Sequence, residues 1–113
     1  MADVILIVED DPFIALDIEG AVREEGFEVL GPAFTVAEAE ALLAATTPDG
    51  AILDYNLGDE TSARIARRLD EADVPFVYVT GRSEALVASE APQARVLSKP
   101  IDPREVVRAL SDA

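Results

Sequence analysis

Apolar runs along this chain stop abruptly at polar residues, and the pattern predicts buried β-strands. Four such runs are followed directly by polar side chains, at Glu9, Asp54, Thr80 and Ser98. Continuous short apolar runs are typical of strands that are buried on both faces of a parallel sheet. Because the carboxyl ends of parallel strands lie at one edge of the sheet, we expect these polar residues at that edge, where open α/β folds hold their sites.

Strand patterns alternate with helical patterns over the whole chain. We expect strands at residues 3–8, 27–30, 51–54, 76–79 and 95–98. We expect helices at residues 12–26, 35–45, 61–72 and 82–90, and a last helix from residue 103. The alternation implies right-handed crossovers and a doubly wound parallel sheet with helices on both faces. We expect one domain over residues 1–113, without an output domain.

Local signals support these boundaries. Asp11 and Asp102 each precede a proline, which combines an N-cap carboxylate with a residue suited to the first helical turn. Thr35 and Glu38 form a capping box. The helix residues expected to face the core are Ile14, Ile18, Val22, Ile65, Leu69, Val106, Val107 and Leu110. The phenylalanines, also expected in the core, are Phe13, Phe27, Phe34 and Phe76.

Glycine and proline mark the predicted turns. Gly31 and Pro32 are expected to close the second strand. Residues 56–60 are expected to form a loop around Gly58.

Composition excludes several classes of function. The chain has no cysteine and no histidine, which rules out disulfides, thiolate or histidine metal sites and a histidine relay within it. Acidic residues outnumber basic ones 23 to 9, and the net charge of −14 argues against nucleic-acid binding. No apolar run reaches the roughly 20 residues that span a bilayer, and no signal peptide is recognisable. We therefore expect a cytoplasmic protein that binds neither nucleic acid nor membranes.

Three carboxylates gather at the predicted sheet edge. Glu9, Asp10 and Asp54 would lie close together and raise one another's pKa. A hard divalent cation such as Mg²⁺ relieves this repulsion, because it prefers carboxylates, a carbonyl and waters. Thr80 and Lys99, the only lysine, would supply a hydroxyl and a point charge to a phosphoryl group. Asp54 is then the candidate nucleophile, because carboxylates form aspartyl-phosphate intermediates.

In this order, the motifs resemble the receiver domain of two-component response regulators over essentially the whole chain. The matching residues are Glu9-Asp10 after ILIV, Asp54 after AIL, Thr80-Gly81 after VYV and Lys99-Pro100 after VLS. The resemblance implies a flavodoxin-like (βα)5 fold, with a five-stranded parallel sheet of strand order 2-1-3-4-5. It also implies a signalling phosphoacceptor rather than an enzyme, with Mg²⁺ as cofactor.

The resemblance assigns a role to each acidic residue. Asp54 is the expected phosphoacceptor. Asp10, Asp54 and the backbone carbonyl of Asn56 are the expected magnesium ligands, and Glu9 is expected to act through a metal-bound water. An Asp10–Asp11 pair is the alternative. We prefer Glu9–Asp10, because Asp11 is the natural helix cap and similar receivers begin with a glutamate–aspartate pair.

The remaining site residues follow the later strands. Thr80 is the expected switch hydroxyl, and Lys99 is the expected phosphate-contacting lysine. Gly81 leaves room beside the pocket, and a cis bond before Pro100 would aim the lysine inward.

The chain departs from the receiver pattern at Val96. Many receivers carry Tyr or Phe at this position, three residues before the lysine, so the usual coupling between threonine and aromatic ring is absent. Residues 77–81 resemble the Phe-Ala-Thr-Gly motif of receivers that are common in alphaproteobacteria, often as single domains, although Tyr and Val precede the threonine here. Arg82 and Asn56 each stand two residues past a site residue, and we expect them to affect the rate of dephosphorylation.

The leading hypothesis is a stand-alone receiver that takes a phosphoryl group from a histidine kinase or a histidine phosphotransfer protein onto Asp54. The signal would reach an unknown downstream protein at the face formed by the helix at 82–90, the strand at 95–98 and the last helix. A phosphorylation-independent scaffold and a phosphate sink in a phosphorelay stay open as alternatives. A magnesium-dependent phosphatase is disfavoured, because Asn56 stands where such an enzyme needs a second acid.

Overall fold

Five parallel strands form the central sheet of the computed structural model, which describes residues 3–81 and 91–112. The strands are β1 (Val4–Val8), β2 (Glu28–Ala33), β3 (Gly50–Asp54), β6 (Phe76–Thr80) and β7 (Val96–Ser98). They are hydrogen-bonded in the order β2-β1-β3-β6-β7. With the small hairpin β4-β5 set aside, this is the order 2-1-3-4-5, so the predicted flavodoxin-like α/β fold is confirmed.

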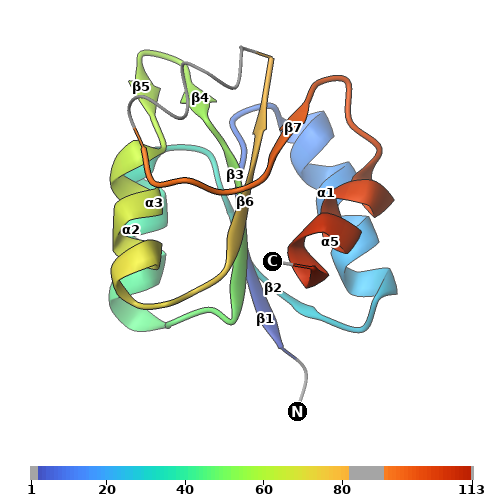
Figure 1. The fold of residues 1–113 in the computed structure, drawn as a ribbon, viewed down its shortest axis with the longest axis horizontal. Helices are drawn as coiled ribbons and strands as arrows, with labels where there is room; N and C mark the ends of the chain where they lie inside the picture. Colours follow the sequence, from blue (N-terminus) through green and yellow to red (C-terminus); the bar gives the residue numbers. More distant parts are fainter. Residues whose placement is uncertain (1–2, 82–90, 113) are drawn as a thin grey trace.

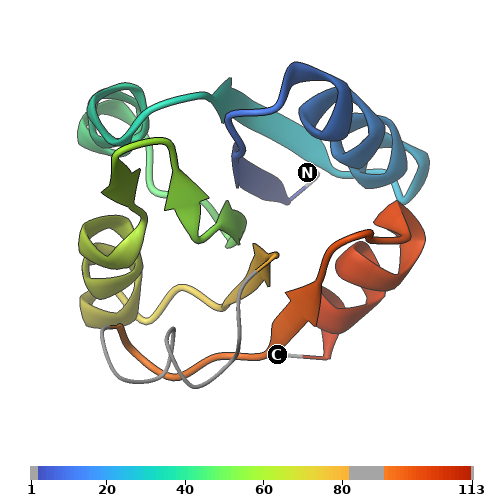
Figure 2. The ribbon, with the colours of Figure 1, turned by 90° about the horizontal axis from the view of Figure 1, so that it is seen from above.

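Helices cover both faces of the sheet, as predicted. On one side lie α2 (Val36–Ala45) and α3 (Ala63–Glu71), and on the other lie α1 (Pro12–Glu24) and α5 (Pro103–Ser111) (Figures 1 and 2). The helix expected at residues 82–90 lies outside the described residues. Within the described part of the chain, no helix combines the length and apolar character needed to cross a bilayer.

Each face of the sheet has its own apolar core. Ile65 and Leu69 of α3 pack in one cluster with the α2 side of the sheet, and Ile18 and Val22 of α1 pack in the other. The predicted stripes are confirmed, because these residues and Val106, Val107 and Leu110 of α5 are buried, and Ile14 of α1 is partly buried against its cluster. Alternate residues of the buried strands point to opposite faces, so each strand contributes to both clusters.

The predicted N-caps are confirmed. Asp11 Oδ1 accepts hydrogen bonds from the backbone N–H groups of Phe13 (2.9 Å) and Ile14 (3.3 Å) at the start of α1. Thr35 Oγ1 accepts from Glu38 N–H (3.1 Å) at the start of α2. Asp102 caps α5 in the same way. These side chains satisfy N–H groups that have no partner within the helix.

The predicted end of the second strand is wrong. β2 continues through Gly31 and Pro32 to Ala33, with a change of register opposite β1. A proline is tolerated there because β2 is an edge strand, where a missing N–H removes no necessary ladder bond. Gly31 has a φ of 100°, and a Cβ atom there would lie 2.7 Å from Ala33 N, so this bend needs glycine.

The loop predicted at residues 56–60 is in fact a short antiparallel hairpin. It consists of β4 (Asn56–Leu57) and β5 (Glu60–Thr61), with Gly58 at a φ of 68° in the turn. Leu57 is buried, and Glu60 Oε2 accepts a hydrogen bond from Val36 N–H at 3.2 Å. The hairpin that follows the end of β3 is therefore joined to the start of α2.

Two of the phenylalanines predicted to be in the core are on the surface. Phe13 is 80% exposed and Phe34 is 40% exposed, whereas Phe76 is buried. Phe13 lies one residue before Ile14, which turns it away from the apolar stripe of α1. Phe34 belongs to the connection before the Thr35 cap.

Replacing the α2 cap should destabilise the protein measurably. Thr35→Ala removes the acceptor of the Glu38 N–H, and we expect it to lower the free energy of unfolding by about 1 kcal/mol. Urea unfolding followed by circular dichroism measures this change. Thr46→Ala is the matched control, because Thr46 is exposed just beyond the end of α2. Equal stability losses in the two variants would contradict the capping role.

Candidate functional site

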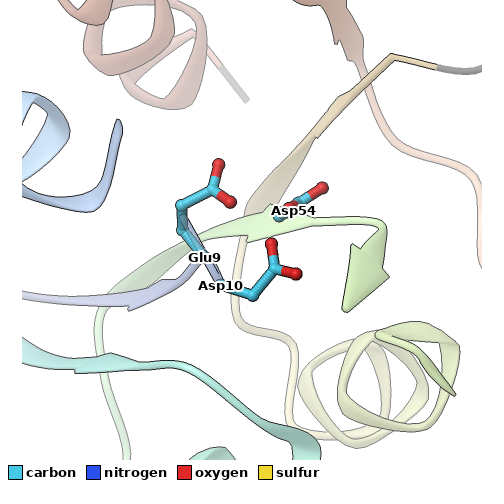
Figure 3. A group of neighbouring side chains, drawn as sticks. All are labelled: Glu9, Asp10 and Asp54. Atoms are coloured by element: carbon cyan, nitrogen blue, oxygen red, sulfur yellow. The ribbon is translucent and has the colours of Figure 1, made fainter. Parts of the chain in front are cut away.

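The register of two strands brings three carboxylates together. β1 and β3 pair in parallel with Val8 opposite Leu53, so Glu9, just beyond β1, and Asp54, the last residue of β3, lie side by side. Glu9, Asp10 and Asp54 each offer a carboxylate oxygen, and these oxygens lie within 4.8 Å of one another. Figure 3 shows the three side chains gathered at the ends of β1 and β3. The predicted acidic group is therefore present as a spatial cluster.

Lys99 is the cation of this cluster. Its Nζ lies 3.2 Å from Asp54 Oδ2, to which it donates a hydrogen bond, and 3.1 Å from Glu9 Oε1. Its backbone N–H donates to the Thr80 carbonyl at 2.9 Å. The Lys99–Pro100 peptide bond is cis. The structure thus places the single lysine between two buried carboxylates, at the edge where the sequence predicted it.

Glu9 is buried although it carries a carboxylate. Its side chain is 1% exposed, and Oε2 accepts hydrogen bonds from Asp11 N–H (3.1 Å) and Lys99 Nζ (3.4 Å). Oε1 lies 3.1 Å from Lys99 Nζ but accepts no well-formed hydrogen bond among the described residues. A buried oxygen without a hydrogen bond is uncommon in proteins. This oxygen is therefore available to a further cationic or hydrogen-bonding ligand.

The crowding changes the proton affinity of Asp54. The pKa of Asp54 is raised from 3.8 to about 8: burial is the largest cause, the hydrogen bond and charge of Glu9 also raise the pKa, and the charge of Lys99 opposes them. Burial alone would lower the pKa of Lys99, but the charges of Asp54 and Glu9 outweigh it and raise that pKa above its ordinary value. The lysine stays protonated and leaves the carboxylate cluster only partly neutralised.

The Asn56 side chain connects the end of β3 to the end of β6. Its Nδ2 donates a hydrogen bond to Thr80 Oγ1 at 3.1 Å, and its backbone N–H donates to Asp54 Oδ1 at 3.2 Å. From the sequence we expected only the Asn56 carbonyl at the site and an effect on dephosphorylation, so this side-chain contact was not predicted. The signal that could have indicated it is the two-residue spacing from Asp54, which places both side chains on the same side of the chain.

The remaining predicted site residues have different surroundings. Asp11 caps α1, as its sequence context predicted, and the three-carboxylate cluster consists of the preceding two acids and Asp54. Gly81 is exposed, and a Cβ atom there would meet no other atom within 4 Å. Val96 is half-buried and is the register partner of Tyr78. Arg82 lies outside the described residues.

The donor set fits a hard divalent cation. Carboxylate oxygens are the ligands that Mg²⁺ prefers, and Asp10 leaves the cluster open to solvent because it is exposed. The raised pKa of Asp54 marks an excess of negative charge that a cation would relieve. Glu9, Asp10 and Asp54 are the residues that could hold such an ion.

Comparisons with known proteins place these residues in a family. The model of the response regulator receiver domain matches residues 5–111. The chain is 36% identical over 117 residues to the phyllosphere-induced regulator PhyR of Methylorubrum extorquens, covering 100% of this chain and 44% of that protein. It is 33% identical over 113 residues to the phosphate regulon transcriptional regulatory protein PhoB of Pseudomonas aeruginosa, covering 94% of this chain and 49% of that protein. The chain thus spans about half the length of these curated relatives.

Solved structures agree with this match. SdrG from Sphingomonas melonis Fr1 is 37% identical with a TM-score of 0.80, and the alignment covers 97% of each chain. A response regulator receiver protein from Sinorhizobium medicae WSM419 is 28% identical with a TM-score of 0.84, and the alignment covers 98% of this chain and 93% of that one.

The stability of the metal-free protein should fall as the pH rises. A carboxyl whose pKa is raised in the folded state stabilises the fold below its unfolded pKa and loses this contribution as the pH rises to its folded pKa. For Asp54 this window runs from 3.8 to about 8. We expect Asp54→Asn to remove most of the decline and to raise the free energy of unfolding at pH 8 by about 1–2 kcal/mol.

Urea unfolding at pH 5 and pH 8, with a chelator present, tests this expectation. Asp59→Asn is the matched control, because it removes an exposed carboxylate from the neighbouring hairpin. If wild type and Asp54→Asn show the same pH dependence, Asp54 is not the group that binds the proton.

Proposed function

The chain belongs to the response regulator receiver domain family, and from this we propose that it accepts a phosphoryl group on Asp54 from a phosphorylated histidine of a partner protein. The observation that carries the proposal is the buried Asp54 carboxylate, which lies 3.2 Å from Lys99 Nζ and within one cluster with Glu9 and Asp10. A carboxylate in contact with a single lysine and two more acids is suited to nucleophilic attack on a phosphoryl group that arrives with a cation.

The proposed step transfers one phosphoryl group. A carboxylate oxygen of Asp54 attacks the phosphorus atom, the bond between phosphorus and the imidazole nitrogen of the donor breaks, and an acyl phosphate forms. The leaving imidazole keeps the electron pair of the broken bond and takes a proton from solvent. Little covalent chemistry is left for the protein, so positioning and electrostatic stabilisation are its contribution.

Three side chains of this chain serve that contribution. Lys99 donates to Asp54 Oδ2 and would donate to a phosphoryl oxygen after transfer. Thr80 is buried at the end of β6, and Asn56 Nδ2 holds its hydroxyl beside the site at 3.1 Å. We propose that Thr80 turns its hydroxyl toward the acyl phosphate, which would exchange the Asn56 contact for one with phosphate.

Magnesium is the proposed cofactor. Asp10, Asp54 and the backbone carbonyl of Asn56 would hold it, with Glu9 acting through a bound water. When bound, the ion neutralises charge on the carboxylates and on the transferred phosphoryl oxygens.

The proposed output is a change in protein–protein contacts. The partner upstream is a histidine kinase or a histidine phosphotransfer protein, and a downstream protein would read the face that includes β7 and α5. The match to SdrG, which covers 97% of each chain at 37% identity, supports a receiver role for this chain.

A phosphorylation-independent scaffold is the second candidate, and Val96 is the observation that favours it. This residue offers no ring to couple with Thr80. Amide spectra with beryllofluoride and magnesium separate the two functions: shifts throughout β7 and α5 indicate a switch, whereas shifts confined to the site indicate a scaffold.

Phosphorylation should depend on Asp54 and on magnesium. Incubation with acetyl phosphate and Mg²⁺ is expected to add the mass of one phosphoryl group, measured on the intact protein. Asp54→Asn should abolish the adduct, because the nucleophile is absent, and a chelator should prevent it in wild type. Asp59→Asn should behave like wild type. A stoichiometric adduct that persists in Asp54→Asn would refute the assignment.

Asp10 and Asp11 should have different roles: Asp10 as a metal ligand and Asp11 as a helix cap. We expect Asp10→Asn to weaken Mg²⁺ binding by more than about tenfold. Replacing a residue that only hydrogen-bonds to a metal ligand already costs about tenfold or more in metal affinity. Asp11→Asn should leave the affinity nearly unchanged, because asparagine is an equally good N-cap. Titration calorimetry with MgCl2 measures both. Equal losses would instead support the Asp10–Asp11 pair as the metal site.

A further inference from the structure

Tyr78 connects β6 to the segment that precedes β7. Its side chain is fully buried, and its hydroxyl donates a hydrogen bond to the Pro92 carbonyl at 2.6 Å. Its backbone N–H donates to the Arg95 carbonyl at 2.9 Å. Burial raises the pKa of the Tyr78 phenol, which therefore stays a neutral donor at physiological pH. Figure 1 shows residues 91–95 in orange, running from the α3 side of the sheet to β7.

The ring of Tyr78 also contacts the residue beside the phosphoacceptor. Tyr55 directly follows Asp54, and its ring meets that of Tyr78 edge to face, with centroids 5.8 Å apart. Phe76 meets Tyr78 in the same manner at 5.4 Å. The Tyr55 N–H donates to the Val79 carbonyl at 2.9 Å. Because packed interiors transmit displacements, a shift at Asp54 reaches Tyr78 through both the rings and the backbone.

Tyr78 supplies an aromatic ring beside the position where Val96 lacks one. The two residues are register partners in β6 and β7, so their side chains lie on the same face of the sheet. Val96 and Ala94 pack against the same core cluster as Tyr78. The aromatic group therefore lies one strand closer to the phosphoacceptor than in receivers that carry it on the last strand.

A cavity borders the segment of residues 91–95, which Tyr78 holds through Pro92 and Arg95. Among the described residues, a cavity of about 580 Å³ is lined by Phe76, by residues 93–95 and by Ala109 and Asp112 at the end of α5. The segment thus has space into which it can move when its hydrogen bond to Tyr78 breaks.

We propose that the Tyr78 hydroxyl is a tether that holds residues 91–95 against β6 in the unphosphorylated protein, and that phosphorylation of Asp54 releases it. Release frees the Pro92 carbonyl and lets the segment leave β6, which changes the surface next to β7 and α5. The coupling to Asp54 rests on the proposed function, whereas the tether itself does not.

Tyr78→Phe tests the tether in the unphosphorylated protein, because it keeps the ring and removes only the hydroxyl. We expect the carbonyl ¹³C resonance of Pro92 to move upfield, and trypsin to cleave after Arg95 about fivefold faster, the factor that corresponds to one net hydrogen bond. Tyr55→Phe removes a hydroxyl from the neighbouring ring and should leave the Pro92 resonance in place. An unchanged Pro92 resonance and cleavage rate in Tyr78→Phe would overturn the tether.

Beryllofluoride with magnesium tests the coupling. In wild type we expect the resonances around Asp54 and the Pro92 carbonyl to shift together, and the cleavage rate after Arg95 to approach that of Tyr78→Phe. In Tyr78→Phe the site should still shift, with little further change at Pro92. Shifts at Asp54 without any at Pro92 would overturn the coupling. If wild type does not bind beryllofluoride at all, the proposed function fails, whereas the unphosphorylated comparison still decides the tether.

Discussion

The constraint on which the rest of the structure depends is the crowding of carboxylates at the ends of β1 and β3. Two of them, Glu9 and Asp54, are almost completely buried, and Lys99 is the lysine that faces both. Burying like charges together is unfavourable unless they are paired, hydrogen-bonded or bound to a cation. The sheet imposes this arrangement, because the parallel register of β1 and β3 places Glu9 and Asp54 side by side at the ends of the two strands. A site held in this condition gains stability from any ligand that supplies positive charge.

Hydrogen bonds and ring contacts connect the carboxylate cluster to the neighbouring strands of the sheet. Asn56 reaches Thr80 across two strand ends, and the Lys99 N–H is bonded to the Thr80 carbonyl. On the α2 side, Tyr55 and Tyr78 continue the connection into the core. A change in charge at Asp54 therefore acts on groups that are already packed and hydrogen-bonded, which is the condition for a discrete rather than a diffuse response.

The local features of the fold were predictable wherever a short stretch of chain decides its own structure. The caps at Asp11, Thr35 and Asp102 were correct, because capping depends on residues two or three positions away. The errors arose where a neighbouring element decided the outcome. Pro32 continues an edge strand because β1 lies beside it on one side only. Phe13 is 80% exposed because it lies beside, and not within, the stripe of α1 that packs on the sheet.

By itself, the sequence determined which residues stand at the strand ends, since apolar runs and the polar residues that follow them are local properties. It thereby determined the chemistry of the site: carboxylates, one hydroxyl and one lysine. Only the tertiary structure decided that Lys99 reaches Glu9 across 90 positions of the chain, and that Asn56 and Tyr78 bond to partners 24 and 14 positions away. Those contacts depend on strand register and on the direction of side chains in the packed core. Neither is encoded in the spacing of residues along a single strand.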